Sequence, residues 1–155
     1  MNYKIIQAVP KDTEELLQVQ RGAYKSQAEL YNNYDIPPIR ETAREISDQF
    51  STHIFLKAFS QGKIVGTVRA AEKNGTCHIG RLAVHPDIQN KGIGRALMKE
   101  IEKYYQPNRF ELFVGSKSDK NIRLYQKLGY NIFKIAKYGC GEIEIFYMEK
   151  MREWI

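Results

Sequence analysis

The chain has 155 residues, of which 43% are hydrophobic and 12% aromatic, so residues 1–155 are expected to fold as a single globular domain rather than stay disordered. The formal net charge is +6, but the positive residues are spread and match no recognisable nucleic-acid-binding motif, so we expect no nucleic-acid partner. No stretch approaches 18 consecutive apolar residues and the N-terminus has no secretion signal, which predicts a cytoplasmic protein without membrane association.

The first fifty residues predict one strand and two helices. Residues 3–9 alternate as a strand, and Asp12 followed by Glu15 resembles a capping box that starts a helix. The polar segment 32–38 ends in two prolines and is expected to be non-helical. A second amphipathic helix then follows, because apolar residues recur at helical spacing. These residues are Ile39, Ala43, Ile46 and Phe50.

The rest of the chain predicts six strands and two helices. Strands are expected over residues 53–59, 63–71 and 76–84, with Gln61-Gly62 and Asn74-Gly75 as hairpin turns between them. A helix to about residue 105 and a strand follow, then a further helix and two strands. The last three strands span residues 109–114, 130–137 and 142–149. The predicted order is βααβββαβαββ.

Residues 82–97 combine an apolar strand, a short turn and the glycine-containing start of a helix. The first N–H groups of a helix lack intrahelical partners and carry partial positive charge, so such a turn can bind a phosphate or pyrophosphate. Gly92 and Gly94 let a ligand approach without a Cβ in the way. A P-loop is a poor match because Arg95 stands where a lysine is needed, and a dinucleotide fingerprint is a poor match because Leu97 replaces its third glycine.

Two motifs in this order, about 30 residues apart, resemble the GCN5-related N-acetyltransferase (GNAT) family. The first is Gln89-x-x-Gly92-x-Gly94, directly after a strand that ends Leu-Ala-Val-His-Pro. The second is segment 121–130, a helix with asparagine and tyrosine that ends in Leu-Gly and an aromatic residue, with the glycine as a left-handed cap. The resemblance covers residues 63–150 and implies an α/β fold, a single GNAT-like domain whose mixed, mostly antiparallel sheet is flanked by helices.

The resemblance further implies acetyl transfer from acetyl-CoA, the cosubstrate, to a primary amine, without a metal. The cysteines, Cys77 and Cys140, lack metal-ligand spacing and are expected to be free thiols. By the same resemblance, an N–H near Val84 donates to the thioester oxygen, Gln89 orders the turn and Asn121 contacts the pantetheine arm. The expected coenzyme-binding residues are Leu82, Ala83, Val84, Gln89, Asn90, Lys91, Gly92, Ile93, Gly94, Arg95, Asn121 and Tyr125.

Acetyl transfer needs a group that takes a proton from the amine and a group that gives one to the departing thiolate. Tyr125 stands where many relatives place a tyrosine general acid, although a tyrosine on an amphipathic helix can also be core packing. His78 occupies the strand position at which some relatives carry a catalytic glutamate, and a neutral imidazole can accept a proton. Glu111, Glu72 and ordered water are the alternatives for the base.

The acceptor is expected to be a small-molecule or peptide amine. By the resemblance, its groove is built largely from the first two helices, their connecting loop and the last strands. Candidate lining residues there are Tyr24, Tyr31, Tyr34 and residues 36–38. Arg69 and Arg81, on central strands, either engage a substrate carboxylate or form salt bridges.

Two further questions stay open at this point. Four basic residues near the second motif either attract a polyanionic coenzyme or form a solvated helix face. They are Lys117, Lys120, Arg123 and Lys127. The alternative function is a non-catalytic acyl-CoA-binding sensor, which would keep the glycine turn and lose the general acid. A homodimer is the alternative to a monomer.

Overall fold

A computed structural model describes residues 2–139 and 143–152, and within them seven strands form one sheet. The strand order is β1-β2-β3-β4-β5-β7-β6, and neighbours pair antiparallel except β4 and β5, which pair parallel. The strands are β1 (Lys4–Gln7), β2 (Ile54–Ser60), β3 (Lys63–Lys73), β4 (Thr76–Val84), β5 (Arg109–Gly115), β6 (Asn131–Tyr138) and β7 (Ile143–Met151). The mixed, mostly antiparallel sheet is confirmed.

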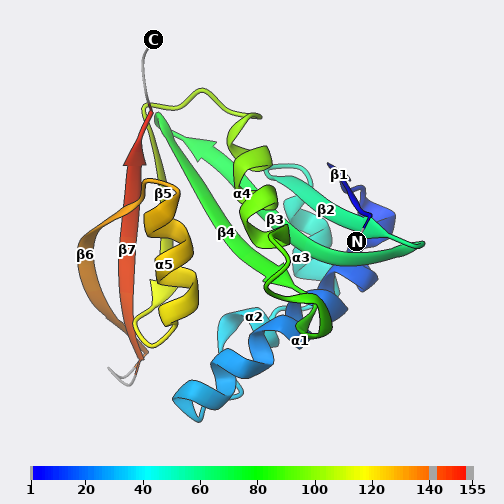
Figure 1. The fold of residues 1–155 in the computed structure, drawn as a ribbon, viewed down its shortest axis with the longest axis horizontal. Helices are drawn as coiled ribbons and strands as arrows, with labels where there is room; N and C mark the ends of the chain where they lie inside the picture. Colours follow the sequence, from blue (N-terminus) through cyan, green and yellow to red (C-terminus); the bar gives the residue numbers. More distant parts are fainter. Residues whose placement is uncertain (1, 140–142, 153–155) are drawn as a thin grey trace.

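Helices cover both faces of this sheet (Figure 1). The α-helices are α1 (Thr13–Tyr31), α2 (Pro37–Arg40), α3 (Ala43–Gln49), α4 (Ile93–Glu102) and α5 (Asp119–Lys127). Short 3-10 turns, η1 (Pro10–Asp12) and η2 (Pro86–Ile88), precede α1 and α4. Apolar residues of α4 and α5 share one core with the central strands, whereas α1 and α3 bury theirs on the opposite face. The sheet is therefore enclosed between two helical layers.

The prediction of one helix from Ile39 to Phe50 was wrong. The segment forms two helices, because Glu41 and Thr42 adopt extended backbone between α2 and α3. Pro37 and Pro38, expected in a non-helical segment, start α2, since a first-turn residue needs no N–H for an intrahelical bond. A capping box is present at Thr42, whose hydroxyl accepts from the N–H of Glu45 at 3.2 Å.

The capping box expected at Asp12 and Glu15 was also wrong, because both carboxylates serve tertiary contacts. Asp12 accepts from the N–H of Val9 and from Lys57 Nζ, both at 2.9 Å. Glu15 accepts from the N–H of Ile64 at 2.7 Å, which fastens α1 to β3. Lys57 lies on β2, so the residues at the start of α1 are fastened to two strands of the sheet.

Several local predictions are confirmed. Both hairpin turns have two successive positive φ angles, 51° and 77° at Gln61-Gly62 and 53° and 81° at Asn74-Gly75, as tight hairpins require. Gly129 ends α5 with a φ of 100°. Cys77 is a buried free cysteine, whereas Cys140 and the predicted strand start at Glu142 lie outside the described residues.

A β-bulge interrupts β4 at Arg81. Thr67 opposes Ala83 and Arg69 opposes Gly80, so Val68 alone faces two residues of β4. Arg81 has a φ of 54°, in the left-handed region that side chains other than glycine rarely adopt. The extra residue reverses the alternation of the strand. Before the bulge Cys77 and Ile79 face the α4 side, whereas after it Leu82 and Val84 do, and Ala83 packs with α1.

Strands β4 and β5 diverge after a short paired stretch. Within the described residues their pairing extends from Thr76 opposite Arg109 to His78 opposite Glu111, and the remainder of β4 runs away from β5 (Figure 1). The sheet is thus opened between its two central strands, next to the bulge.

Candidate active site

A cavity of about 480 Å³ occupies the opening between β4 and β5. Its lining comes from α1 on one face of the sheet and from the start of α4 and from α5 on the other, so the cavity crosses the sheet. Ten of the twelve expected coenzyme-binding residues line this first cavity. They are Leu82, Ala83, Val84, Gln89, Asn90, Gly92, Ile93, Gly94, Arg95 and Asn121. Of the described residues, Lys91 and Tyr125 are the two expected members that its lining lacks.

The backbone of Val84 faces the opening. The N–H of His85 donates to the carbonyl of Val65 on β3 at 2.8 Å, and because N–H direction alternates along a strand, the N–H of Val84 points to the β5 side. The carbonyl of Val84 accepts from Gln89 Nε2 at 3.2 Å rather than from β3, which agrees with that direction. Gln89 therefore fixes the turn to the end of β4.

The turn before α4 presents main-chain donors to the same cavity. Asn90 and Gly92 have φ angles of 64° and 81°, and this left-handed geometry lets the chain enter the helix at Ile93. The first N–H groups of α4 have no acceptor within the helix. A Cβ at Gly94 would stand 3.6 to 3.8 Å from Leu124, Leu82 and Val84, so a methyl group fits there but a longer side chain projects into the cavity.

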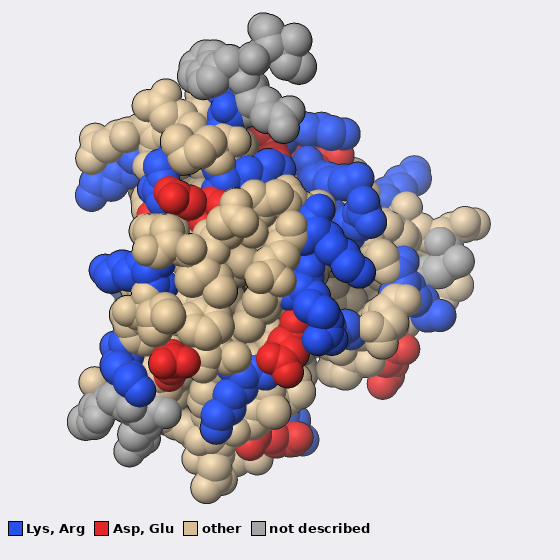
Figure 2. Space-filling view, turned by 60° about the vertical axis from the view of Figure 1, so that its left-hand side comes forward, with Lys and Arg blue, Asp and Glu red and all other residues tan. Residues whose placement is uncertain are grey.

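Positive side chains surround the first cavity. Its lining includes Arg95, Lys117, Lys120 and Arg123, with Asp119 as the carboxylate among the described lining residues. Figure 2 shows that Lys and Arg outnumber Asp and Glu on the face it presents. A positive rim around main-chain donors attracts a polyanion such as a pyrophosphate.

The far wall of the first cavity is held by contacts between α1 and the β5–α5 connection. Ser118 Oγ donates to Gln27 Oε1 at 2.5 Å, and the N–H of Lys117 donates to the Tyr31 hydroxyl at 2.9 Å. Tyr24, further back on α1, also lines the cavity. These hydrogen bonds hold α1 against the connection between β5 and α5.

Tyr125 lies behind the cavity wall rather than on it. It is 7% exposed and packs edge-on against Tyr130, with ring centroids 6.2 Å apart. Burial raises the pKa of the Tyr125 hydroxyl, so the phenol stays protonated at neutral pH.

A second cavity of about 320 Å³ begins where the first ends along β4. Arg81 lines the second cavity and Leu82, the next residue, lines the first. The described residues that form the second cavity come from the α2–α3 region, β3, β4 and β5. They are Glu41, Gln49, His53, Arg69, His78, Ile79, Gly80, Arg81, Glu111, Leu112 and Phe113.

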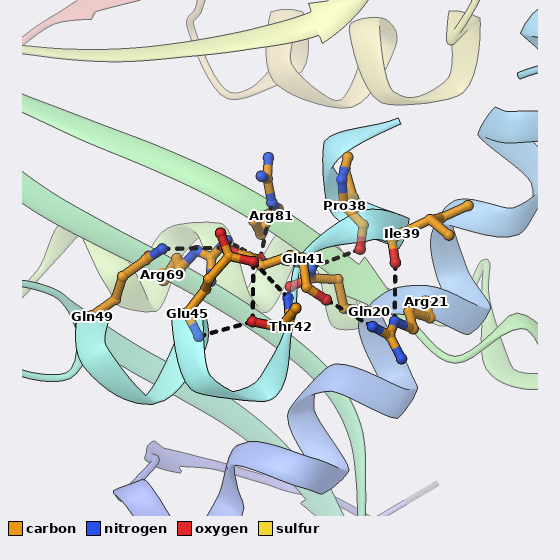
Figure 3. Close-up of polar contacts among 10 residues, drawn as sticks. All are labelled: Gln20, Arg21, Pro38, Ile39, Glu41, Thr42, Glu45, Gln49, Arg69 and Arg81. Carbon is orange, nitrogen blue, oxygen red and sulfur yellow. Dashed lines mark hydrogen bonds and ion pairs between the residues drawn. The ribbon is translucent and has the colours of Figure 1, made fainter. Parts of the chain in front are cut away.

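The carboxylate of Glu41 is the centre of the second cavity's wall (Figure 3). Its Oε1 accepts from Arg69 Nη2 at 2.6 Å, from Gln20 Nε2 at 2.9 Å and from Arg81 Nε at 3.5 Å. Its Oε2 accepts from Gln49 Nε2 at 3.1 Å. The break between α2 and α3 is thus anchored to both β3 and β4.

In this wall, burial and the neighbouring positive charges shift the pKa of Glu41 in opposite directions. Burial alone would raise the pKa of Glu41, but hydrogen bonds from Arg69 and Gln20 and the charges of Arg69 and Arg81 outweigh it, so the pKa lies below its ordinary range. Burial, together with the charge of Arg69, lowers the pKa of His53. The His53 imidazole is therefore neutral at neutral pH.

The structure brings His78 and Glu111 together and separates both from Glu72. His78 Nδ1 lies 3.6 Å from Glu111 Oε2 in the second cavity, and Glu111 Oε1 also pairs with Arg109 at 2.9 Å. Glu72 is exposed and pairs in register with Cys77, away from both cavities as described. His78 is four residues before Leu82, about 13 Å along an extended strand, so a proton path between them needs water.

Residues expected to line the acceptor groove do not border the second cavity. In the described chain Tyr24 lines the first cavity, Tyr31 contacts Lys117, Tyr34 is exposed and Ile36 is buried, so none of the four borders the second cavity. Sequence reasoning missed Glu41, Gln49 and His53. The spacing of Thr42 and Glu45 as a capping box is the signal that would have located the helix break beside Glu41.

A search of the described residues finds no helix long and apolar enough to span a membrane. The same part of the chain holds no group of three or more His, Cys, Asp or Glu side chains placed to bind a metal ion.

Comparisons with known proteins agree with this geometry. A sequence profile of the acetyltransferase (GNAT) family matches residues 13–130. The UPF0157 protein YqkA of Bacillus subtilis is 28% identical over 141 residues, which are 90% of this chain and 40% of that protein, so the chain spans less than half of this relative.

Solved structures share the whole fold. The PaiA N-acetyltransferase of Thermoplasma acidophilum in complex with coenzyme A superposes with a TM-score of 0.80 at 22% identity, covering 98% of this chain and 100% of that one. The ribosomal-protein-S18-alanine N-acetyltransferase of Escherichia coli gives a TM-score of 0.80 at 20% identity, covering 99% and 96%.

Proposed function

Because the chain belongs to the GNAT family of acetyltransferases, we propose that it moves an acetyl group from acetyl-CoA to a primary amine by direct attack of the amine on the thioester. One observation carries the proposal. The two cavities meet at a single step of β4, from Arg81 to Leu82, so a thioester in the first cavity and an amine in the second can approach from opposite sides.

The first cavity fits acetyl-CoA as the cosubstrate. Main-chain donors at the start of α4 and the basic side chains around them suit a pyrophosphate, while Leu82, Ile88 and Leu124 suit the pantetheine arm. Asn121, which lines this cavity, would hydrogen-bond that arm. Bound acetyl-CoA would supply the activated acetyl group.

The protein would supply three functions to the transfer. The N–H of Val84 donates to the thioester oxygen as negative charge develops there. His78, beside Glu111, accepts the proton that the amine loses, through water. Tyr125, which lies behind the wall of the first cavity, would have to reach into it to donate its proton to the sulfur as the bond between the acetyl carbon and sulfur breaks, which leaves neutral coenzyme A and an amide.

For the acceptor we propose only a class, a small-molecule or peptide amine. For the protein we propose a cytoplasmic location. Association of two copies remains a prediction, as does the expectation that no nucleic acid binds.

Incubation with acetyl-CoA and a panel of primary amines tests the proposal. We expect release of coenzyme A thiol in proportion to an N-acetylated product that mass spectrometry identifies. Calorimetry with acetyl-CoA alone distinguishes an acetyltransferase from a non-catalytic acyl-CoA sensor when it is compared with turnover. Tight binding without turnover on any amine would favour the non-catalytic sensor, and absence of binding would refute both.

A further inference from the structure

We infer that the acceptor amine also carries a carboxylate, as an amino acid does, and that Arg81, supported by Arg69, binds this carboxylate in the second cavity. The inference rests on the proposed acetyl transfer and adds the chemical class of the acceptor. Three observations support it: an unsatisfied donor on Arg69, an unusual backbone angle at Arg81 and an excess of positive charge in the cavity wall.

The first observation is the buried guanidinium of Arg69. The residue is 6% exposed, and its Nη2 donates to Glu41 at 2.6 Å. Its Nη1 is buried without a hydrogen-bond partner among the described residues. Leaving a charged donor buried and unpaired costs free energy, and an acceptor atom brought to this wall from outside the chain would relieve that cost.

The second observation is the conformation of Arg81. Its φ of 54° is a strained value for arginine, and strain of this kind is found where a side chain must be directed to a functional position. Nε is held 3.5 Å from Glu41 Oε1, while the tip of the guanidinium points away from Glu41 (Figure 3). The two tip nitrogens make no hydrogen bond to the described residues, and the side chain is partly exposed.

The third observation is the charge of the wall. Arg69 and Arg81 share one carboxylate, Glu41, so this end of the second cavity has one positive charge in excess. His53 is neutral here because its pKa is lowered, and Glu111, at the other end, shares Arg109 with Glu149, so the positive excess is confined to the Glu41 end. One uncompensated guanidinium matches one carboxylate, which binds its planar fork through two parallel hydrogen bonds.

The position of Arg81 accounts for specificity as well as affinity. Arg81 immediately precedes Leu82, whose backbone borders the first cavity. A carboxylate on Arg81 therefore holds the rest of a small acceptor beside the point where the thioester is expected. An amine a few bonds from that carboxylate can then reach the thioester carbon.

The test compares each amino acid of a panel with its carboxamide and with the amine that lacks the carboxyl group. For wild-type protein, we expect kcat/KM to be roughly 10²-fold higher for the acid, which is typical of a desolvated charge pair. Arg81→Gln should remove this preference by lowering kcat/KM for the acid and leaving the other two unchanged. Arg44→Gln, the same change at an exposed arginine of α3, is the matched control and should behave as wild type.

The outcomes distinguish the two proposals. Equal kcat/KM for the acid and both analogues in the wild type would overturn the inference and leave acetyl transfer intact, and this comparison needs no variant to fold. An equal loss on all three substrates in Arg81→Gln would assign the arginine to structure alone and also overturn it. If no amine of any class is acetylated although acetyl-CoA binds, the proposed function itself fails.

Discussion

The two cavities are built on different principles. Ten of the 22 described residues that line the first come from one segment, Leu82 to Arg95, and this segment offers main-chain N–H groups that any sequence with the right turn can present. The second is formed by charged side chains from separate segments that meet at Glu41. A site made of backbone suits a ligand that many proteins share, whereas a site made of side chains can differ from one protein to the next. On this ground we propose the first cavity for the coenzyme and the second for the acceptor.

The largest expected effect is at Gly94, in the first cavity. Gly94→Glu places a carboxylate where the pyrophosphate is expected, and like charges brought together cost several kcal/mol, so acetyl-CoA affinity should fall about 10³-fold by calorimetry. Gly94→Ala is the matched control and should bind within a few-fold of wild type, since its methyl group has ordinary van der Waals room. Unchanged affinity in a folded Gly94→Glu variant would contradict the coenzyme assignment.

The next effect separates chemistry from binding. Tyr125→Phe removes the acidic proton and nearly preserves shape, so kcat should fall about 10²-fold while acetyl-CoA affinity stays close to wild type. Tyr24→Phe is the comparison, because Tyr24 also borders the first cavity. A larger kcat loss in Tyr24→Phe than in Tyr125→Phe would transfer the acid role to Tyr24.

Glu41 tests whether the second cavity depends on a single carboxylate. Glu41→Gln leaves Arg69 buried without an anion, which should cost about 3 kcal/mol of unfolding free energy and lower Tm by roughly 6–12 °C. Glu45→Gln, at the exposed capping box, should change Tm little, since glutamine also fits that position. Equal Tm values for the two variants would show that the Glu41 contacts do not stabilise the fold.

The same variant has a defined pH dependence. The folded pKa of Glu41 is lowered, so its carboxylate stabilises the fold above the ordinary pKa of 4.5, and this contribution is lost as pH falls through the folded pKa. The Tm difference between wild type and Glu41→Gln should therefore be largest near neutral pH and shrink below about pH 4. A constant difference down to pH 3 would place the cause elsewhere.

The smallest expected effect concerns proton removal by His78. If its imidazole is the base, His78→Gln should lower kcat/KM at neutral pH, because glutamine cannot accept the proton that the amine loses. Equal kcat/KM for the two proteins would instead point to Glu111 or to water, and Glu111→Gln would be the next variant to measure.

What the sequence predicts correctly is local. The hairpin glycines, the cap at Gly129 and the turn around Gly92 are set by backbone angles that neighbouring residues require. Helix existence follows from apolar spacing in the same way. For this reason the strands and the turn that forms part of the first cavity are predictable from local patterns, whereas the mixed sheet topology was expected from the family resemblance.

What the sequence does not predict is fixed by contacts between distant segments. Apolar spacing from Ile39 to Phe50 is compatible with one helix; the capping box of Thr42 and Glu45 marks the break locally, but its place against the sheet is set by Glu41, which pairs with Arg69 and Arg81, 28 and 40 residues further along the chain. Asp12 is drawn from a capping role in the same way, by Lys57, 45 residues away. Such pairs leave no local pattern, and the acceptor cavity consists mostly of them.

The bulge at Arg81 makes the length of β4 as important as its residue identities. Ile79 and Leu82 are three residues apart and both face the α4 side, so removing Arg81 would restore a spacing of two and leave Leu82, Ala83 and Val84 on their present faces. The deletion would instead remove the guanidinium and the bend and extra twist that a bulge gives its strand, at the point where β4 leaves β5. When related chains are aligned through this strand, a gap between Gly80 and Leu82 would therefore indicate a straighter strand and a different second cavity.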